Sequence, residues 1–253
     1  MLKDQGEKHS GNGHEPASQK KTGKQAAPRA EYSTWSSDLG FMPRGRPLPL
    51  REAIRQLPRR YRFILTKPGL EPFFPEAGLG EWKIVWFQLL VYAVVAAGLT
   101  FVRTLFAPPA SGGGTGLDSP AIARALGLGT SLGLVVLIPL LFFFAMGLLY
   151  WLARASGGHG SFVQQAYTTL LFLVPCGIIT SVLGLIPFAG SFLAFFLGLL
   201  LFIYCVVLQC FATVVVHQMP GDKATRATII TALSLIPASL LCLGLWTLVF
   251  VII

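Results

Sequence analysis

The chain has 253 residues, of which 53% are hydrophobic and only 12% are charged, and its mean hydropathy is +0.64. A soluble domain carries about 25% charged residues, so this composition excludes a disordered protein and argues against a soluble globule. The net charge of +9 is unevenly placed, because residues 1–83 hold fifteen of the twenty basic and nine of the eleven acidic residues. We therefore expect a polar front third joined to an apolar membrane domain.

The first 43 residues form the most polar part of the chain. They are rich in Lys, Gly, Ser, Gln and Pro and poor in branched aliphatic side chains. Such a segment buries too little apolar surface to offset the entropy lost on ordering. We predict that residues 1–43 are a disordered N-terminal tail.

Residues 44–83 read as a basic segment beside the membrane, and basic and apolar side chains alternate in its first half. The apolar residues recur at helical spacing, which predicts a short amphipathic helix that Pro58 interrupts. Basic clusters beside a membrane span attract anionic phospholipids by about 1 kcal/mol per charge. We predict such lipid contacts for Arg51, Arg55, Arg59, Arg60 and Arg62. The alternative is a solvated arm that only sets the topology, and no nucleic-acid partner is expected.

The remainder of the chain contains five long apolar runs. A bilayer core of ~30 Å needs about 20 apolar residues in a helix, and the runs that meet this length are about 84–106, 132–153, 163–186, 191–216 and 228–252. We predict an all-α integral membrane protein built as a bundle of five transmembrane helices. Prolines inside three runs predict helix kinks at Pro139, Pro175 and Pro237.

The basic residues predict the orientation. With a cytoplasmic N-terminus, the inner side holds the fifteen basic residues of the front segment together with Arg154, Lys223 and Arg226, which makes eighteen against two. The positive-inside rule therefore predicts a cytoplasmic N-terminus and an external C-terminus.

The apolar part offers little for catalysis or metal binding. No carboxylate lies between Asp118 and Asp222, whereas proton-coupled carriers and carboxylate metal sites need buried acids. We predict no enzyme activity, no metal and no cofactor. Two alternatives stay open: a transporter or channel subunit for a neutral or amphipathic solute that uses the proline-broken spans, or an enzyme acting on lipid if Ser161, His159 and His217 come together.

Short motifs occur in a definite order over about residues 50–253. They are Gln56-Leu57-Pro58 with Tyr61 and Lys67-Pro68, Glu81-Trp82 with Trp86 and Gln88-Leu89, Gly157-Gly158 and Gly160-Ser161-Phe162 with Tyr167 and Pro175, and the stretch from His217 to Arg226. Together with five spans, this order resembles the prokaryotic-type branch of the Yip-one domain family, five-span membrane proteins named for their interaction with Ypt/Rab GTPases.

The resemblance implies a cytoplasmic N-terminus, helical-hairpin packing and an inner-face motif formed by Gly157, Gly158, Gly160, Ser161, Phe162, His217, Lys223 and Arg226. For eukaryotic members it implies roles in ER–Golgi traffic and binding of prenylated GTPases. This chain lacks their acidic Asp-Pro motif, which argues against a small GTPase as its partner. We predict a non-enzymatic scaffold or adaptor in a prokaryotic cytoplasmic membrane that organises lipid, partner membrane proteins or further copies of itself.

Overall fold

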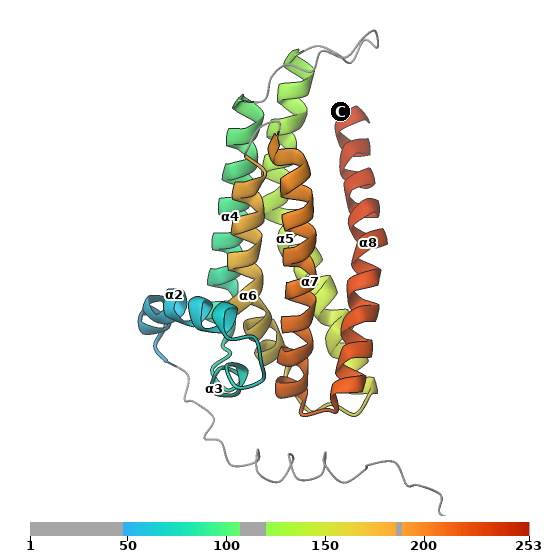
Figure 1. The fold of residues 1–253 in the computed structure, drawn as a ribbon. Helices are drawn as coiled ribbons and strands as arrows, with labels where there is room; N and C mark the ends of the chain where they lie inside the picture. Colours follow the sequence, from blue (N-terminus) through green and yellow to red (C-terminus); the bar gives the residue numbers. More distant parts are fainter. Residues whose placement is uncertain (1–47, 107–119, 186–188, 253) are drawn as a thin grey trace, which may run out of the picture. The chain divides into compact units, whose positions relative to one another are not determined.

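The computed structural model describes residues 48–106, 120–185 and 189–252, and within these ranges it contains helices and their connections but no strand. Two short helices, α2 (Leu50–Thr66) and α3 (Phe73–Glu76), precede the five long ones. The long helices are α4 (Trp82–Phe106), α5 (Pro120–Ala155), α6 (Phe162–Leu183), α7 (Ala189–His217) and α8 (Gly221–Ile252) (Figure 1). The tail predicted to be disordered lies outside the described residues.

The five long helices confirm the predicted all-α membrane bundle. Each is long and apolar enough to cross a membrane. Their bounds differ most from the predicted runs at α5 and α8, which begin at Pro120 and Gly221 rather than near residues 132 and 228. The reason is that hydropathy marks the part of a helix inside the bilayer core, whereas the hydrogen-bonded helix continues beyond it.

The long helices are arranged as a ring. Helix α4 packs against α5 and α6, and α8 packs against α5 and α7, while α6 and α7 are neighbours. The order around the ring is therefore α4, α5, α8, α7, α6. Helix α2 packs against α4 and α6, and α3 packs against α7. Both short helices lie at the end of the bundle where α5 meets α6 and α7 meets α8 (Figure 1). We call this the basic end and the other the opposite end.

The prolines do not interrupt their helices. The expectation that Pro58 breaks the amphipathic segment is wrong, because α2 continues through it for 17 residues. A proline removes one backbone hydrogen bond but fixes φ near its helical value, and the buried Leu57 and Ile64 hold α2 on both sides of it. The three membrane prolines likewise lie inside the continuous helices α5, α6 and α8.

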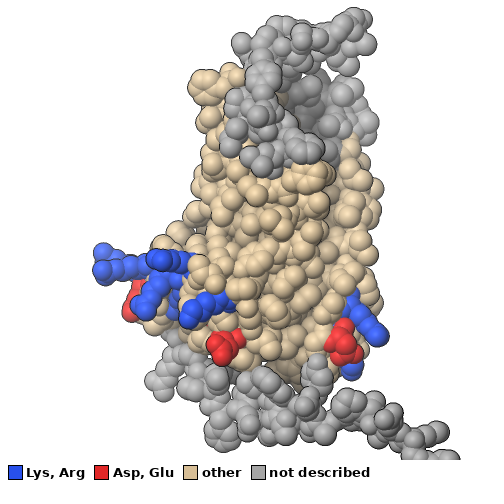
Figure 2. Space-filling model, in the orientation of Figure 1, with Lys and Arg blue, Asp and Glu red and all other residues tan. Residues whose placement is uncertain are grey.

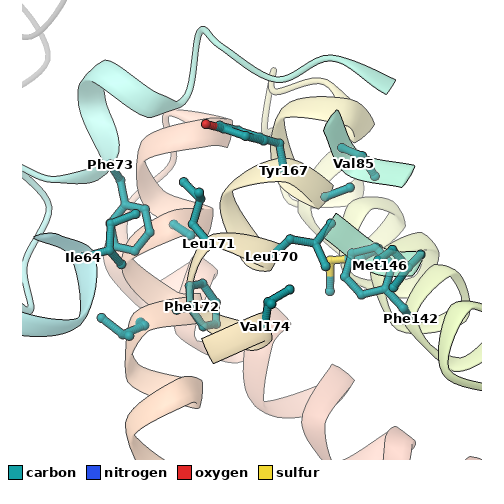
Figure 3. Close-up of a cluster of buried hydrophobic side chains, with 14 of the residues drawn as sticks. Ile64, Phe73, Val85, Phe142, Met146, Tyr167, Leu170, Leu171, Phe172 and Val174 are labelled. Atoms are coloured by element: carbon teal, nitrogen blue, oxygen red, sulfur yellow. The ribbon is translucent and has the colours of Figure 1, made fainter. Parts of the chain in front are cut away.

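The hydrophobic core lies toward the basic end. Figure 3 shows Ile64 of α2, Phe73 of α3 and Phe172 of α6 packed together. The Phe73 and Phe172 rings meet edge to face with centroids 6.3 Å apart, a favoured aromatic geometry. Among the described side chains, the buried residues of α7 lie between 208 and 217 and those of α8 between 224 and 231. The short helices therefore contribute to the same core as the membrane spans.

Candidate functional site: the basic end of the bundle

Helix α2 has two faces with different partners. Leu57 and Ile64 are buried against the bundle. Four arginines occupy the outward surface at spacings of four, four and three residues, and all are exposed: Arg51, Arg55, Arg59 and Arg62. We call these four residues the arginine stripe. Figure 2 shows the basic side chains gathered beside α2. In the described part of the chain no member of the stripe forms an ion pair, so its charge is available to an anionic surface.

Arg60 differs from the stripe because it points into the protein. Its Nη1 lies 2.7 Å from Glu76 Oε2 and donates to the Tyr167 hydroxyl at 2.7 Å. Tyr167 in turn donates to the same Glu76 oxygen at 2.9 Å. The Arg60 side chain is only 12% exposed. The expected lipid contact of Arg60 is therefore replaced by an ionic triad that joins α2, α3 and α6.

The carboxylate of this triad is strongly desolvated. Burial raises the pKa of the Glu76 carboxyl above its ordinary value, although the charge of Arg60 and the hydrogen bonds from Tyr167 and Arg60 act in the opposite direction. This balance is typical of buried ion pairs, in which loss of hydration competes with the attraction between the charges. Sequence reasoning missed Glu76, and the available signal was a single acid within the apolar run Phe73–Ala77.

Two further hydrogen bonds fix α2 to the spans. The Tyr61 hydroxyl donates to Gln88 Oε1 of α4 at 3.0 Å, and the Tyr204 hydroxyl of α7 donates to the Leu65 carbonyl at 2.7 Å. Burial raises the pKa of Tyr61, which keeps its hydroxyl protonated and able to donate. Helix α2 is thus hydrogen-bonded to α3, α4, α6 and α7 and lies in the same compact unit as the five long helices.

A glycine loop encloses His217 at the same end. The peptide nitrogen of His159 donates to the His217 carbonyl at 3.1 Å. A Cβ atom on Gly158 would lie 2.8 Å from His217 Cβ, and one on Gly160 would lie 2.5 Å from the Val216 carbonyl oxygen. Gly157 has φ +92°, a conformation that favours glycine. The loop therefore requires all three glycines in order to pass over the fully buried His217.

The other residues of the predicted inner-face motif lie around this loop. Ser161 caps α6, with its hydroxyl accepting from Gln164 N in a capping box, and Phe162 stacks on Trp82 with centroids 5.8 Å apart. Lys223 Nζ donates to the Ser156 carbonyl at 3.3 Å, and Arg226 is exposed on the first turns of α8. The motif thus joins the α5–α6 loop to the α7–α8 connection.

Ser161, His159 and His217 lie close in this structure, but not as a nucleophile and its base. Ser161 is engaged as a helix cap and His159 is exposed. Both ring nitrogens of His217 are buried and have no hydrogen-bond partner among the described residues. Within the described residues no hydrogen bond joins the serine hydroxyl to either imidazole, and a catalytic pair needs that bond or a close approach to it. The same ranges contain no group of three His, Cys, Asp or Glu that could hold a metal ion.

A buried polar chain crosses from α6 to α7 above the loop. Gln165 Nε2 donates to Thr169 Oγ1 at 3.4 Å, and Thr169 Oγ1 donates to Gln209 Oε1 at 3.0 Å. Gln209 Nε2 then donates to Thr213 Oγ1 at 3.4 Å. Uncharged polar side chains commonly join membrane helices in this way. Thr169 and Gln209 therefore join α6 to α7 inside the bundle.

Comparison of the sequence with known protein families identifies the family of this chain. The family model described as the Yip1 domain matches residues 64–252. No curated protein and no solved structure matches the sequence. The matched residues include Glu76, Tyr167, the glycine loop and His217, whereas Arg60 and the arginine stripe precede them. The chain, a multi-pass membrane protein with five apolar helices, therefore belongs to the Yip1 domain family.

Proposed function

We propose that this protein is a non-enzymatic membrane scaffold whose arginine stripe binds anionic phospholipid headgroups. The observation that carries the proposal is that the arginines of α2 fall into two groups with different surroundings. Arg60 is used internally, while Arg51, Arg55, Arg59 and Arg62 are exposed and unpaired within the described residues. Each basic residue near an anionic surface contributes about 1 kcal/mol.

The docking of α2 supports a scaffold more than a free tether. Four hydrogen-bonding partners on four helices hold α2 in one orientation. The docked helix holds the four arginines in one row, and arginine binds phosphate oxygens through two parallel N–H donors. The bundle would thus present lipid in a defined position to partner membrane proteins or to further copies of itself.

The core favours a scaffold over the alternative of a transporter. Large side chains from six helices, among them Phe73, Leu149, Leu170 and Phe172, fill the bundle at the basic end. A solute path would instead need polar groups around a hydrated cavity. We also propose the cytoplasmic side for the basic end, on the charge asymmetry of the sequence.

Lipid selectivity of the full chain tests the proposal. The protein is placed in bilayers that contain a spin-labelled phosphatidylglycerol or a spin-labelled phosphatidylcholine, and the motionally restricted lipid fraction is measured. We expect a preference for the anionic lipid that weakens at high salt, since exposed charges are screened. Replacing all four stripe arginines by Gln should remove most of it.

The matched control replaces Arg103, an exposed cation near the opposite end of α4, by Gln. This variant should keep the preference. An anionic preference that survives both high salt and the loss of the stripe would contradict the proposal. Copurification of crosslinked membrane proteins, compared between wild type and the stripe variant, then tests the scaffold role itself.

A further inference from the structure

Two cysteine thiols face each other between two membrane spans. The thiols of Cys176 on α6 and Cys205 on α7 lie within hydrogen-bonding reach of each other. Both residues belong to apolar spans, and both carry free thiols. Cys176 is only 3% exposed, whereas Cys205 is half-buried. We call these two residues the thiol pair, and the function proposed above makes no use of it.

Contacts between α6 and α7 enclose the thiol pair on both sides. Toward the basic end, Thr169 Oγ1 donates to Gln209 Oε1 at 3.0 Å. Toward the opposite end, a Cβ atom on Gly198 would lie 4.0 Å from Thr180 Cγ2, which is ordinary van der Waals contact. The same number of residues, eleven, separates these two contacts on α6 and on α7. The two helices therefore stay in register over this stretch, and the thiol pair lies within it.

The position of the thiol pair decides which reagents reach it. A Cβ atom on Gly177 would collide with the Tyr92 side chain, so α4 covers α6 beside Cys176. Cys205 packs against the core but stays partly exposed near the middle of the span Phe195–His217. With a rise of 1.5 Å per residue, it lies about 15 Å or more from either end of that span. A reagent therefore arrives from the hydrocarbon of the bilayer and meets Cys205 first.

The chemistry of two adjacent thiols favours oxidation over metal binding. A structural zinc ion needs four ligands, and the described residues contain no group of three His, Cys, Asp or Glu that could hold a metal. A monovalent ion between two thiolates would leave a net charge inside the bilayer, which is costly. Oxidation of one thiol gives a sulfenic acid, which condenses with a neighbouring thiol to a disulfide. The thiols and the disulfide are all neutral, so this conversion leaves no ion in the span.

We propose that the thiol pair is a modification site at which a lipid hydroperoxide converts Cys176 and Cys205 into a disulfide. The Cys205 sulfur takes the terminal oxygen of the hydroperoxide and becomes a sulfenic acid, while the rest of the hydroperoxide leaves as a lipid alcohol with the thiol proton. The Cys176 sulfur then displaces the sulfenic oxygen, which leaves as water with the second proton. One peroxide bond is reduced by two electrons, and the new S–S bond ties α6 to α7. The arginine stripe takes no part, so either proposal can fail without the other.

The test uses the full chain, reduced beforehand, in liposomes that contain a hydroperoxide of an unsaturated phosphatidylcholine. Free thiols are then alkylated in denaturant, and disulfides are mapped by mass spectrometry of the peptides. We expect the linked peptides of Cys176 and Cys205 to be the main oxidation product and a reducing agent to separate them. Liposomes with the corresponding lipid alcohol should give no link. Hydrogen peroxide at the same concentration should form the link several-fold more slowly, because it is supplied from water.

The matched control is Cys210→Ser. An α-helix turns about 100° per residue, so Cys210 lies about 140° around α7 from Cys205, and this variant should form the link at the wild-type rate. Cys205→Ser should lose the link and leave Cys176 alkylated. Retained helix content and elution volume show that each variant folds, and Cys205→Ala takes the place of Cys205→Ser if that variant does not.

Three results would overturn the proposal. The first is that no linked peptide forms with the lipid hydroperoxide. The second is that the link forms equally fast with the lipid alcohol or with hydrogen peroxide. The third is that the disulfides join mainly two copies of the chain or persist in Cys205→Ser.

Discussion

The two ends of this bundle are built by different means. At the basic end, an ionic triad, two tyrosine hydrogen bonds, a glycine loop and a buried polar chain join elements that are far apart in the sequence. Toward the opposite end, the described parts of α7 and α8 carry exposed or half-buried apolar side chains. Since lipid tails are as apolar as Leu, apolar contact alone does not hold membrane helices together. Polar links and close backbone contact therefore decide where this bundle is closed.

The largest effect expected of a single substitution is at Arg60. Arg60→Met leaves the Glu76 carboxylate buried without its counter-charge, which costs about 3–5 kcal/mol. The measurement is the free energy of unfolding in mixed micelles. Arg55→Met on the exposed side of α2 is the control and should stay within about 0.5 kcal/mol of wild type. Equal losses in the two variants would show that the triad does not hold α2.

The glycine loop should give the next largest effect. Gly160→Ala would place a Cβ atom 2.5 Å from the Val216 carbonyl oxygen and 2.9 Å from His217 Nδ1. Backbone does not yield easily, and overpacking of this kind costs about 1–3 kcal/mol. Gly147→Ala in α5, where a Cβ meets nothing within 4 Å, should instead gain about 0.5–1 kcal/mol. The midpoint of thermal unfolding should therefore fall for Gly160→Ala and rise for Gly147→Ala.

A smaller difference is expected from the polar chain. Thr169→Val keeps the shape of the side chain but removes the donor to Gln209 across α6 and α7. Hydrogen bonds between membrane helices contribute about 0.6 kcal/mol on average. Ser239→Ala, whose hydroxyl bonds only within α8, should be neutral. A larger loss of unfolding free energy in Ser239→Ala than in Thr169→Val would contradict the conclusion that polar links hold the basic end together.

The smallest effect is a dependence of stability on pH. The folded-state pKa of Glu76 is raised by burial, so the protonated carboxyl is favoured in the folded protein. Its contribution is fully present below the unfolded value of about 4.3 and is lost as the pH rises through the raised folded value. The unfolding free energy of wild type minus that of Glu76→Gln should therefore fall with rising pH. A difference that rises with pH would mean that the charge of Arg60 lowers the pKa of Glu76 more than burial raises it.

Much of this fold follows from the sequence. Hydropathy predicts five spans because each helix must offer about 20 apolar residues to the bilayer, and helical spacing predicts α2 because one of its sides is apolar. The glycines at 157, 158 and 160 and His217 stand out as motifs, and the structure brings them together.

Three features could not be read from local pattern. Arg60 looks like its neighbours in sequence, and only the fold, which places Glu76 and Tyr167 beside it, turns it inward. Pro58 looks like a helix breaker, but tertiary packing of Leu57 and Ile64 outweighs one lost hydrogen bond. The bundle-facing side of α8 is also similar in composition along its length, so the greater exposure of its second half depends on neighbours that sequence spacing does not reveal.

The most direct test of the difference between the two ends uses two alanines on the same side of α8. Ala227 is 3% exposed and Ala238, three turns further on, is half-buried. Unfolding of Ala227→Phe and Ala238→Phe is measured in identical bilayers. We predict that Ala227→Phe loses about 1–3 kcal/mol through overpacking, whereas Ala238→Phe retains wild-type stability. Equal destabilisation of the two variants would show that α8 is closed along its whole length and would contradict the account.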